Sequence, residues 1–230
     1  MKTGAGFLAC AFGLAALVSG AVAQVAPSAA EAQAYQGLQQ AALRGDVPRL
    51  RALIAAGADL EARDARGRTA VHIAAHARQR DSLRVLAEAG SSLDALESDR
   101  YDAVTITAVA DDPATLALLL SLGESAKQIT SRYDGTALIA AAHLGHDEVV
   151  RQLIAAGAPL DHVNNLHWTA LIESIVLGDG GPRHQRTMAA LLKAGASTAL
   201  ADRQGNTPLQ LAKARGYAAM VDQLQAAGAK

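Results

Sequence analysis

The chain has 230 residues, of which 50% are hydrophobic and 3% aromatic, with 21 Lys and Arg against 22 Asp and Glu. This composition excludes an intrinsically disordered or collagen-like chain, and the length suits one or two domains with a substantial core. The formal charge of −1 and the lack of a basic cluster argue against a nucleic-acid partner and against a membrane-surface helix.

The first 23 residues have the pattern of a cleavable secretory signal. Lys2 is followed by no charge until Glu31, the intervening stretch is largely apolar, and Ala21-Val22-Ala23 supplies a small-residue cleavage pattern. The mature chain is expected to begin near Gln24, with residues 24–34 as a lead-in and no membrane contact after cleavage. The alternative is an envelope-anchored adaptor, because the apolar run is also long enough to span a bilayer if it is not cleaved.

The only cysteine, Cys10, lies inside this signal. The mature protein would therefore have neither a disulfide nor a thiol nucleophile. An exported chain without cysteine suits an oxidising compartment. We expect a periplasmic or secreted protein.

A glycine recurs after an apolar, Leu-rich stretch along the rest of the chain. The intervals between successive members are 33, 33, 34, 38 and 33 residues, for Gly57, Gly90, Gly123, Gly157, Gly195 and Gly228. A second landmark precedes the later glycines, in the form of Thr69, Thr136, Thr169 and Thr207, each followed by a small residue or proline and then Val or Leu, with Asp102 in the equivalent place. One unit is repeated along the chain, and one copy carries an insertion.

These residues resemble the ankyrin repeat, a unit of about 33 residues with a turn, a capped helix start and two antiparallel helices. The segment Asp202-Arg203-Gln204-Gly205-Asn206-Thr207-Pro208-Leu209 is nearly the full family opening. The resemblance implies an all-α solenoid of about six helix-turn-helix units with short β-hairpin or turn tips. The expected units are residues 35–63, 64–96, 97–130, 131–163, 164–201 and 202–230.

The side chains at the landmarks explain the unit physically. The Thr and Asp oxygens stand where they can cap the free N–H groups at a helix start, and glycine suits a left-handed helix stop. Four turn positions depart from the family's glycine, so we expect distorted turns there; they are Arg78, Arg100, Asp111 and His167. At the N-terminal end, Ser28 and Glu31 form a capping-box pattern, followed by an expected helix through Leu43 and a turn at Gly45-Asp46.

The resemblance implies a recognition scaffold whose hairpin tips and concave helix face bind a partner protein. Trp, Tyr and Arg are common in protein interfaces, and several fall in the turns before helix starts. The predicted partner-binding residues are Arg66, Arg68, His76, Arg100, Tyr101, Arg132, Tyr133, His143, Trp168 and Arg203. In the competing interpretation the aromatics cover adjacent turns and the arginines are solvated.

The insertion falls at Gly178–His184, between the two helices of the fifth unit. It lacks the strand, lysine and spacing of a phosphate-binding loop, and one aspartate cannot build a calcium site. Similar long loops are, by resemblance, typical of exported bacterial ankyrin proteins. We expect a loop contact with a partner through Asp179, Arg183 and His184.

Histidines supply the one metal-like pattern, because His72 and His76 are four residues apart and His143 and His146 three apart. The helix-start position makes a structural role for His72 more natural. No recognised catalytic motif is present, so we expect a non-enzyme without metal or cofactor. The alternative, a small-ligand or metal-dependent protein, would need His76, His143 and His184 to cluster with a carboxylate. The expected protein is a monomer with an unidentified partner, for which the resemblance favours a periplasmic or envelope enzyme.

Overall fold

The computed structural model describes residues 25–230, so the predicted signal at residues 1–23 lies outside the described residues. Within them, thirteen helices and one isolated β-bridge between Thr130 and Gly135 account for the regular structure. The predicted all-α architecture is confirmed. The helices are α1 (Ala29–Ala34), α2 (Gly37–Arg44), α3 (Val47–Ala55), α4 (Ala70–His76), α5 (Arg80–Glu88), α6 (Ala103–Val109), α7 (Pro113–Ser121), α8 (Ala137–Leu144), α9 (Asp147–Ala155), α10 (Ala170–Val176), α11 (Pro182–Lys193), α12 (Pro208–Ala214) and α13 (Ala218–Ala226).

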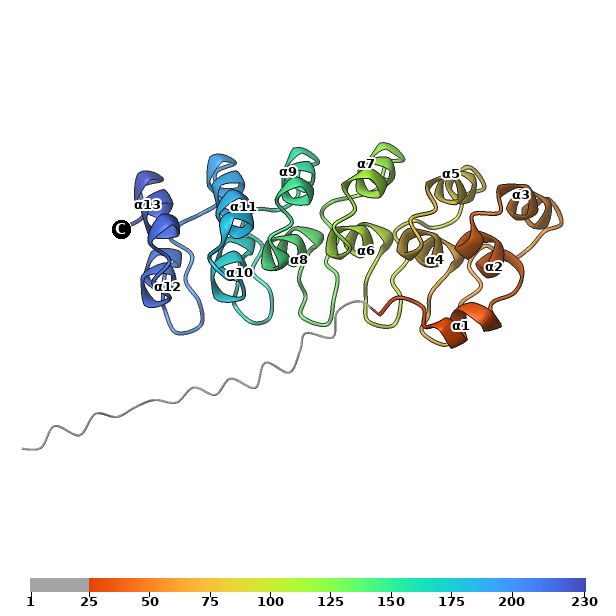
Figure 1. Ribbon diagram of the computed structural model, residues 1–230, viewed down its shortest axis with the longest axis horizontal. Coiled ribbons are helices and arrows are strands. Elements are labelled where there is room, and N and C mark those ends of the chain that lie inside the picture. Colours follow the sequence, from red (N-terminus) through yellow and green to blue (C-terminus); the bar gives the residue numbers. More distant parts are fainter. Residues whose placement is uncertain (1–24) are drawn as a thin grey trace, which may run out of the picture.

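The helices after α1 form antiparallel pairs that stack side by side in chain order (Figure 1). Each helix of a pair contacts its counterpart in the next pair, so the helices form two rows. The inner row is α2, α4, α6, α8, α10 and α12, and the outer row is α3, α5, α7, α9, α11 and α13. The loops that join one pair to the next project to one side of the stack; we call them fingers, at residues 56–69, 89–102, 122–136, 156–169 and 194–207. None of the helices described is long and apolar enough to cross a membrane.

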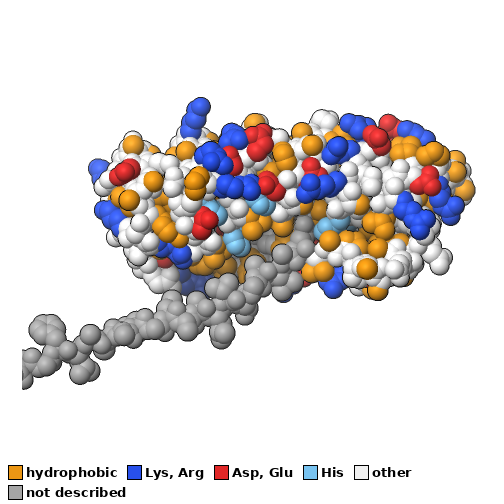
Figure 2. All heavy atoms as spheres, viewed as in Figure 1, with side chains coloured by type: hydrophobic (Ala, Val, Ile, Leu, Met, Phe, Trp, Pro, Cys, Tyr) orange, Lys and Arg blue, Asp and Glu red, His pale blue; other side chains and the backbone are white. Residues whose placement is uncertain are grey.

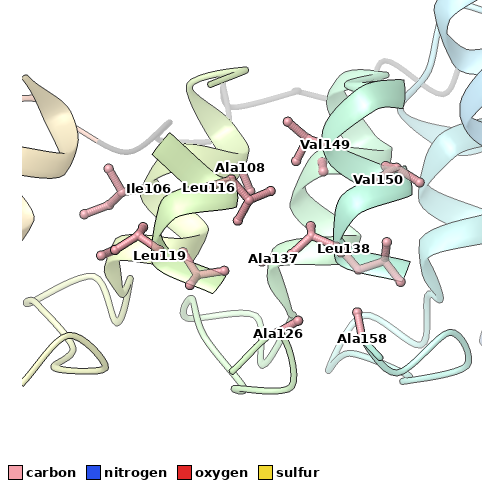
Figure 3. Close-up of a cluster of buried hydrophobic side chains, with 14 of the residues drawn as sticks. Ile106, Ala108, Leu116, Leu119, Ala126, Ala137, Leu138, Val149, Val150 and Ala158 are labelled. Carbon is pink, nitrogen blue, oxygen red and sulfur yellow. The ribbon is translucent and has the colours of Figure 1, made fainter. Parts of the chain in front are cut away.

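The core runs continuously between the two rows, because a single pair cannot bury both of its apolar faces. Figure 3 shows the junction of the third and fourth units, where Ile106 and Leu119 come from one pair and Leu138 and Val149 from the next. All four side chains are fully buried. Complete burial of one such side chain contributes about 1.5–3 kcal/mol. Stability therefore depends on the contacts between neighbouring units as much as on each unit.

The predicted helix caps are confirmed. Asp102, Thr136, Thr169 and Thr207 each accept a hydrogen bond from the backbone N–H three residues later. In the second unit the imidazole of His72 completes a capping box. Its Nδ1 accepts a hydrogen bond from the backbone N–H of Thr69 at 3.1 Å. Such caps satisfy donors that would otherwise be unpaired in the interior.

The expected distortion at the substituted glycine positions is wrong. Arg78, Arg100, Asp111 and His167 have φ values of 57°, 65°, 49° and 65°, within the left-handed region that glycine occupies in the other units. The hydrogen bond that closes the finger turn is also kept. The backbone N–H groups of Arg100 and His167 donate to the carbonyl group three residues earlier at 2.9 Å, as those of Gly67 and Gly205 do. Arg100 and His167 lie in finger turns, and Arg78 and Asp111 lie in the turns between the two helices of a pair. The repeat imposes the left-handed backbone at both places, and the non-glycine residues carry its steric cost.

The N-terminal segment differs from the expected single helix through Leu43. The capping box of Ser28 and Glu31 is present, but α1 ends at Ala34 because Tyr35 has an extended backbone with ψ of 141°. The chain then restarts as α2, which ends as expected at Gly45 in a left-handed conformation. Tyr35 instead turns its hydroxyl inward and donates to Asp64 Oδ2 at 2.6 Å.

Candidate functional site: the fingers and the inner face

Each finger is held by the first residue of its turn. Asp64 Oδ1 accepts from the backbone N–H groups of the residues two and four positions later, at 2.8 and 2.9 Å. The same pair of bonds recurs in every finger, with the acceptors Glu97, Ser131, Asn164 and Asp202. A side-chain oxygen of the right reach is what the turn requires, and several residue types supply it. The finger tips are therefore fixed in the free protein.

Neighbouring fingers are joined to one another at their tips. Backbone N–H groups of Ser98, Ser131 and Asn165 donate to the carbonyl groups of Arg66, Arg100 and Tyr133 on the preceding finger, at 2.8–2.9 Å. Three of the four predicted tip arginines also take part, and all four remain exposed. Arg100 pairs with Asp134 at 2.9 Å, Arg132 pairs with Asp99, and Arg203 Nη2 donates to the Asn165 carbonyl at 2.9 Å. Arg66 pairs instead with Glu31 of α1 at 3.3 Å.

Two adjacent tips present large apolar side chains to solvent. Tyr133 is 41% exposed and Leu166, in the equivalent place on the next finger, is 38% exposed. Ile129 and Val163, on the same two fingers, are 45% and 42% exposed. We call these four residues the apolar tip patch. Only Tyr133 is among the residues predicted from sequence; Leu166 could have been found because it follows Tyr133 by one repeat period of 33 residues.

The residue just before each cap lies deeper than the tips. Tyr101 and Trp168 are half-buried there, between the finger and the inner helix. Arg68 occupies the same position in its unit, and its prediction as a partner-binding residue is wrong, because it is 1% exposed. Its guanidinium donates to Asp64 at 2.7 Å, to Glu31 at 2.6 Å and to the Val25 carbonyl at 3.1 Å. Arg68 thus holds the N-terminal segment against the first finger.

The inner face is the surface formed by the seventh residue of successive inner helices, His76, Val109, His143 and Val176, all partly exposed. On the side of the molecule in Figure 2, histidine side chains lie beneath a band of charged ones. Burial lowers the pKa of His143, and it lowers that of His76 to about 4, so both imidazoles are neutral at pH 7. The predicted histidines are therefore uncharged groups on a mainly apolar surface.

One carboxyl group on this face was not predicted from the sequence. Glu173 of α10 is 5% exposed, accepts from Asn164 Nδ2 at 2.8 Å through Oε1, and places Oε2 3.8 Å from His143 Nδ1. Burial raises the pKa of Glu173 to about 7. Its position in the repeat could have revealed it in the sequence. Glu173 is the fourth residue of its inner helix, and the equivalent residues of the other units are apolar, namely Ile73, Ile106, Ala140 and Leu211.

The insertion is largely structural. Its second half forms the start of α11, which begins at Pro182. The predicted loop contact at His184 is wrong, because the ring is 9% exposed and bonds Asp179 Oδ1 at 2.8 Å and the His143 carbonyl at 2.9 Å. Arg183 is exposed, but it pairs with Asp111 at 2.6 Å. Asp179, with 78% of its side chain exposed, is the most exposed of the three.

The histidines do not gather as a metal centre would require. His72 is fully buried and its Nε2 lies 3.2 Å from the Tyr101 carbonyl, a structural role. His184 approaches His143 through the backbone carbonyl, whereas His76 lies two units away on α4. Among residues 25–230, no group of three or more His, Cys, Asp or Glu is arranged to hold a metal ion.

The stacked helix pairs, capped starts and projecting fingers define a solenoid repeat protein of the kind that presents a surface to other proteins. The chain belongs to the ankyrin-repeat family. Family profiles described as ankyrin repeats match residues 38–87 (many copies) and 104–197 (3 copies). The ankyrin fold is generally a non-enzymatic interaction scaffold.

Three relatives illustrate the similarity. The ankyrin repeat protein YahD of Escherichia coli K12 is 41% identical over 100 residues, so the chain spans about half the length of this curated relative, and 43% of this chain is matched. An ankyrin repeat domain from Acinetobacter baumannii AYE is 41% identical, with a TM-score of 0.79, covering 84% of this chain and 98% of that one. The ankyrin repeat domain of Bcl-3, a member of the IkappaB protein family, is 25% identical, with a TM-score of 0.76 and coverage of 86% and 88%.

Proposed function

We propose that this protein is a non-catalytic scaffold that binds a partner protein through its finger tips and inner face. The observation that carries the proposal is the apolar tip patch of Ile129, Tyr133, Val163 and Leu166, four large apolar side chains exposed on two adjacent fingers. The backbone of these fingers is fixed by the hydrogen bonds of Ser131 and Asn164. Binding would therefore require little ordering of the scaffold, which favours affinity.

The composition of the patch suits the centre of an interface. Aromatic and apolar side chains form the buried core of protein interfaces, and arginines are frequent in and around them. Three exposed arginines lie on the same or adjacent fingers: Arg100, Arg132 and Arg203. Hydration of the patch is unfavourable in the free protein, so covering it would be a source of binding energy.

The proposal includes export to the periplasm or cell exterior. It is supported by the charge-free apolar stretch after Lys2 and by Ala21-Val22-Ala23. N-terminal sequencing of the protein purified from a periplasmic extract should give a chain that starts near Gln24. Recovery with the membrane fraction and an intact N-terminus would replace the soluble scaffold with the anchored adaptor.

The partner-binding proposal is tested by capture from the native cell envelope with a Tyr133→Ala/Leu166→Ala variant. We expect the wild type to retain a specific protein after gentle cross-linking and the variant to lose it, with both showing the same helical content and unfolding midpoint. The matched control is Leu122→Ala/Leu177→Ala, which removes two similarly exposed apolar side chains at the C-caps of α7 and α10 and leaves the apolar tip patch intact. Equal loss in this control would show that the tips are not the binding surface.

A further inference from the structure

We propose that Glu173 and His143 form a site on the inner face that binds the ammonium group of a lysine side chain from the partner protein. The inference rests on the proposed partner-binding function and specifies part of the partner's chemistry. It is carried by two side-chain atoms, Glu173 Oε2 and His143 Nδ1, that face each other at 3.8 Å, beyond direct hydrogen-bond distance.

The first argument is the position of Glu173 in the repeat. The fourth residue of the inner helix is Ile73, Ile106, Ala140 or Leu211 in the other units whose helix start carries a Thr or Asp cap. The solenoid therefore accepts an apolar side chain at this position and does not require a carboxyl group there. A nearly buried carboxyl group in a row of apolar residues points to a role outside the packing of the fold.

The second argument is the support that the carboxyl group receives. Asn164 uses its Oδ1 to hold the finger turn, as Asp64 and Asp202 do in their units. Because it is an amide, its Nδ2 can also donate to Glu173 Oε1, at 2.8 Å. An aspartate at this place would repel the carboxylate. The finger and the helix thus fix one oxygen of Glu173 and leave the other directed toward His143.

The third argument is the missing positive charge. No Lys or Arg of the described residues forms an ion pair with Glu173; the one partner within ion-pair distance is His143. Burial lowers the pKa of His143, so its imidazole carries no charge at neutral pH. A buried carboxylate without a cation is costly, and a cation supplied from outside would offset that cost.

The spacing of the two acceptors selects the ligand. An ammonium nitrogen about 2.8 Å from each of two atoms that are 3.8 Å apart fits a bent bridge, with Nδ1 of His143 accepting in its Nε2–H tautomer. One free carboxylate oxygen cannot provide the two parallel acceptors that a guanidinium prefers. Lysine therefore fits this site better than arginine. The neighbouring apolar residues Ala140 and Val176 are suited to the aliphatic part of its side chain.

The test is an NMR titration of the purified protein, with glutamate labelled at Cδ and histidine labelled in the ring, at pH 8. The probe is Nα-acetyl-lysine N-methylamide, and the comparison compound is Nα-acetyl-norleucine N-methylamide, which lacks the ammonium group. We expect the Glu173 Cδ and His143 ring resonances to shift saturably in the millimolar range with the lysine compound alone. The corresponding arginine compound should bind more weakly.

Two variants make the result specific. Glu173→Gln keeps the shape and the acceptor for Asn164, and it should abolish the shift of His143. Glu148→Gln, at an exposed glutamate on the outer helix α9, should leave the titration unchanged. Equal shifts with norleucine, no shift of Glu173 up to the solubility limit of the probe, or unchanged binding by Glu173→Gln would overturn the site. Because no partner protein is present, such a failure leaves the capture result for the finger tips unaffected.

Discussion

Arg183 donates from Nη2 to Asp111 Oδ2 at 2.6 Å, across 72 residues of sequence. The same guanidinium donates from Nε to the Gly145 carbonyl at 3.1 Å. The insertion in the fifth unit is thereby connected to the fourth unit and to the third. In a simple solenoid each unit contacts only its immediate neighbours. This contact reaches one unit further and should couple the unfolding of three units.

Arg183→Ala should lower the free energy of unfolding by less than about 1 kcal/mol, because the side chains of the pair are 50% and 36% exposed. A double-mutant cycle with Asp111→Ala should give a coupling energy of about 0.2–1 kcal/mol. Urea denaturation at low ionic strength is the measurement. Arg203→Ala is the control, because its guanidinium contacts a backbone carbonyl of an adjacent finger. Additive effects of the two substitutions would show that the contact contributes nothing in solution.

The left-handed turn at His167 leads to a second prediction. His167 has φ of 65°, its side chain is exposed, and glycine fills the equivalent position at Gly205. His167→Gly should therefore raise the free energy of unfolding by about 0.5–1 kcal/mol, since relief of steric strain exceeds the added entropy of the unfolded chain.

The reciprocal substitution tests the same cause. Gly205→Ala should lower the free energy of unfolding by about 1 kcal/mol, because φ there is 81°, which is unfavourable for alanine. An added Cβ would meet nothing within 4 Å, so the loss would report backbone strain alone. Thermal unfolding followed by circular dichroism is sufficient for both variants. A destabilised His167→Gly would mean that the histidine side chain makes a contact that outweighs the strain.

The fold could be predicted from sequence because the caps and glycines that define each unit recur with a fixed period. Thr136, Thr169 and Thr207 act locally, each on a backbone N–H three residues later, so their role is visible in the sequence. The candidate site could be predicted only in part. Tyr133 was found by residue type, whereas Leu166 is conspicuous only once its neighbouring finger is considered.

The two wrong site assignments, Arg68 and His184, share a physical cause, which is pairing with residues far apart in sequence. Arg68 was expected at the surface, but Glu31 lies 37 residues earlier and neutralises its charge within the interior. His184 was expected in an open loop, but its ring reaches the His143 carbonyl 41 residues away. Neither partner follows from the repeat period, so spacing alone carried no information about them.

The buried guanidinium of Arg68 predicts a large loss of stability on truncation. Arg68→Ala should lower the free energy of unfolding by about 3 kcal/mol, because Asp64 loses its buried cation and the N-terminal segment loses its anchor. Hydrogen exchange should increase first in α1, which is held by Glu31. Arg66→Ala, with 44% of its side chain exposed, should cost less than about 1 kcal/mol. Equal costs for the two variants would contradict the assigned role of Arg68.

Glu173 predicts a specific pH dependence of stability. Its folded pKa of about 7 lies above the ordinary value of 4.5, because burial penalises the carboxylate. Between these values the folded state binds more protons than the unfolded state, so this group's contribution to stability falls as pH rises, by up to about 3 kcal/mol. Glu173→Gln should match the wild type near pH 4 and be more stable at pH 8.

The difference between the two proteins, measured by urea denaturation across this pH range, isolates Glu173 from His72 and His76. Burial lowers the pKa of both histidines to about 4, so their contributions rise with pH in both proteins and cancel in the difference. Parallel curves for the wild type and Glu173→Gln would show that the carboxyl group ionises as freely as in water. If Glu173→Gln is more stable than the wild type at pH 8 and no longer binds the lysine probe, Glu173 lowers the free energy of unfolding and serves binding, as expected of a residue retained for function.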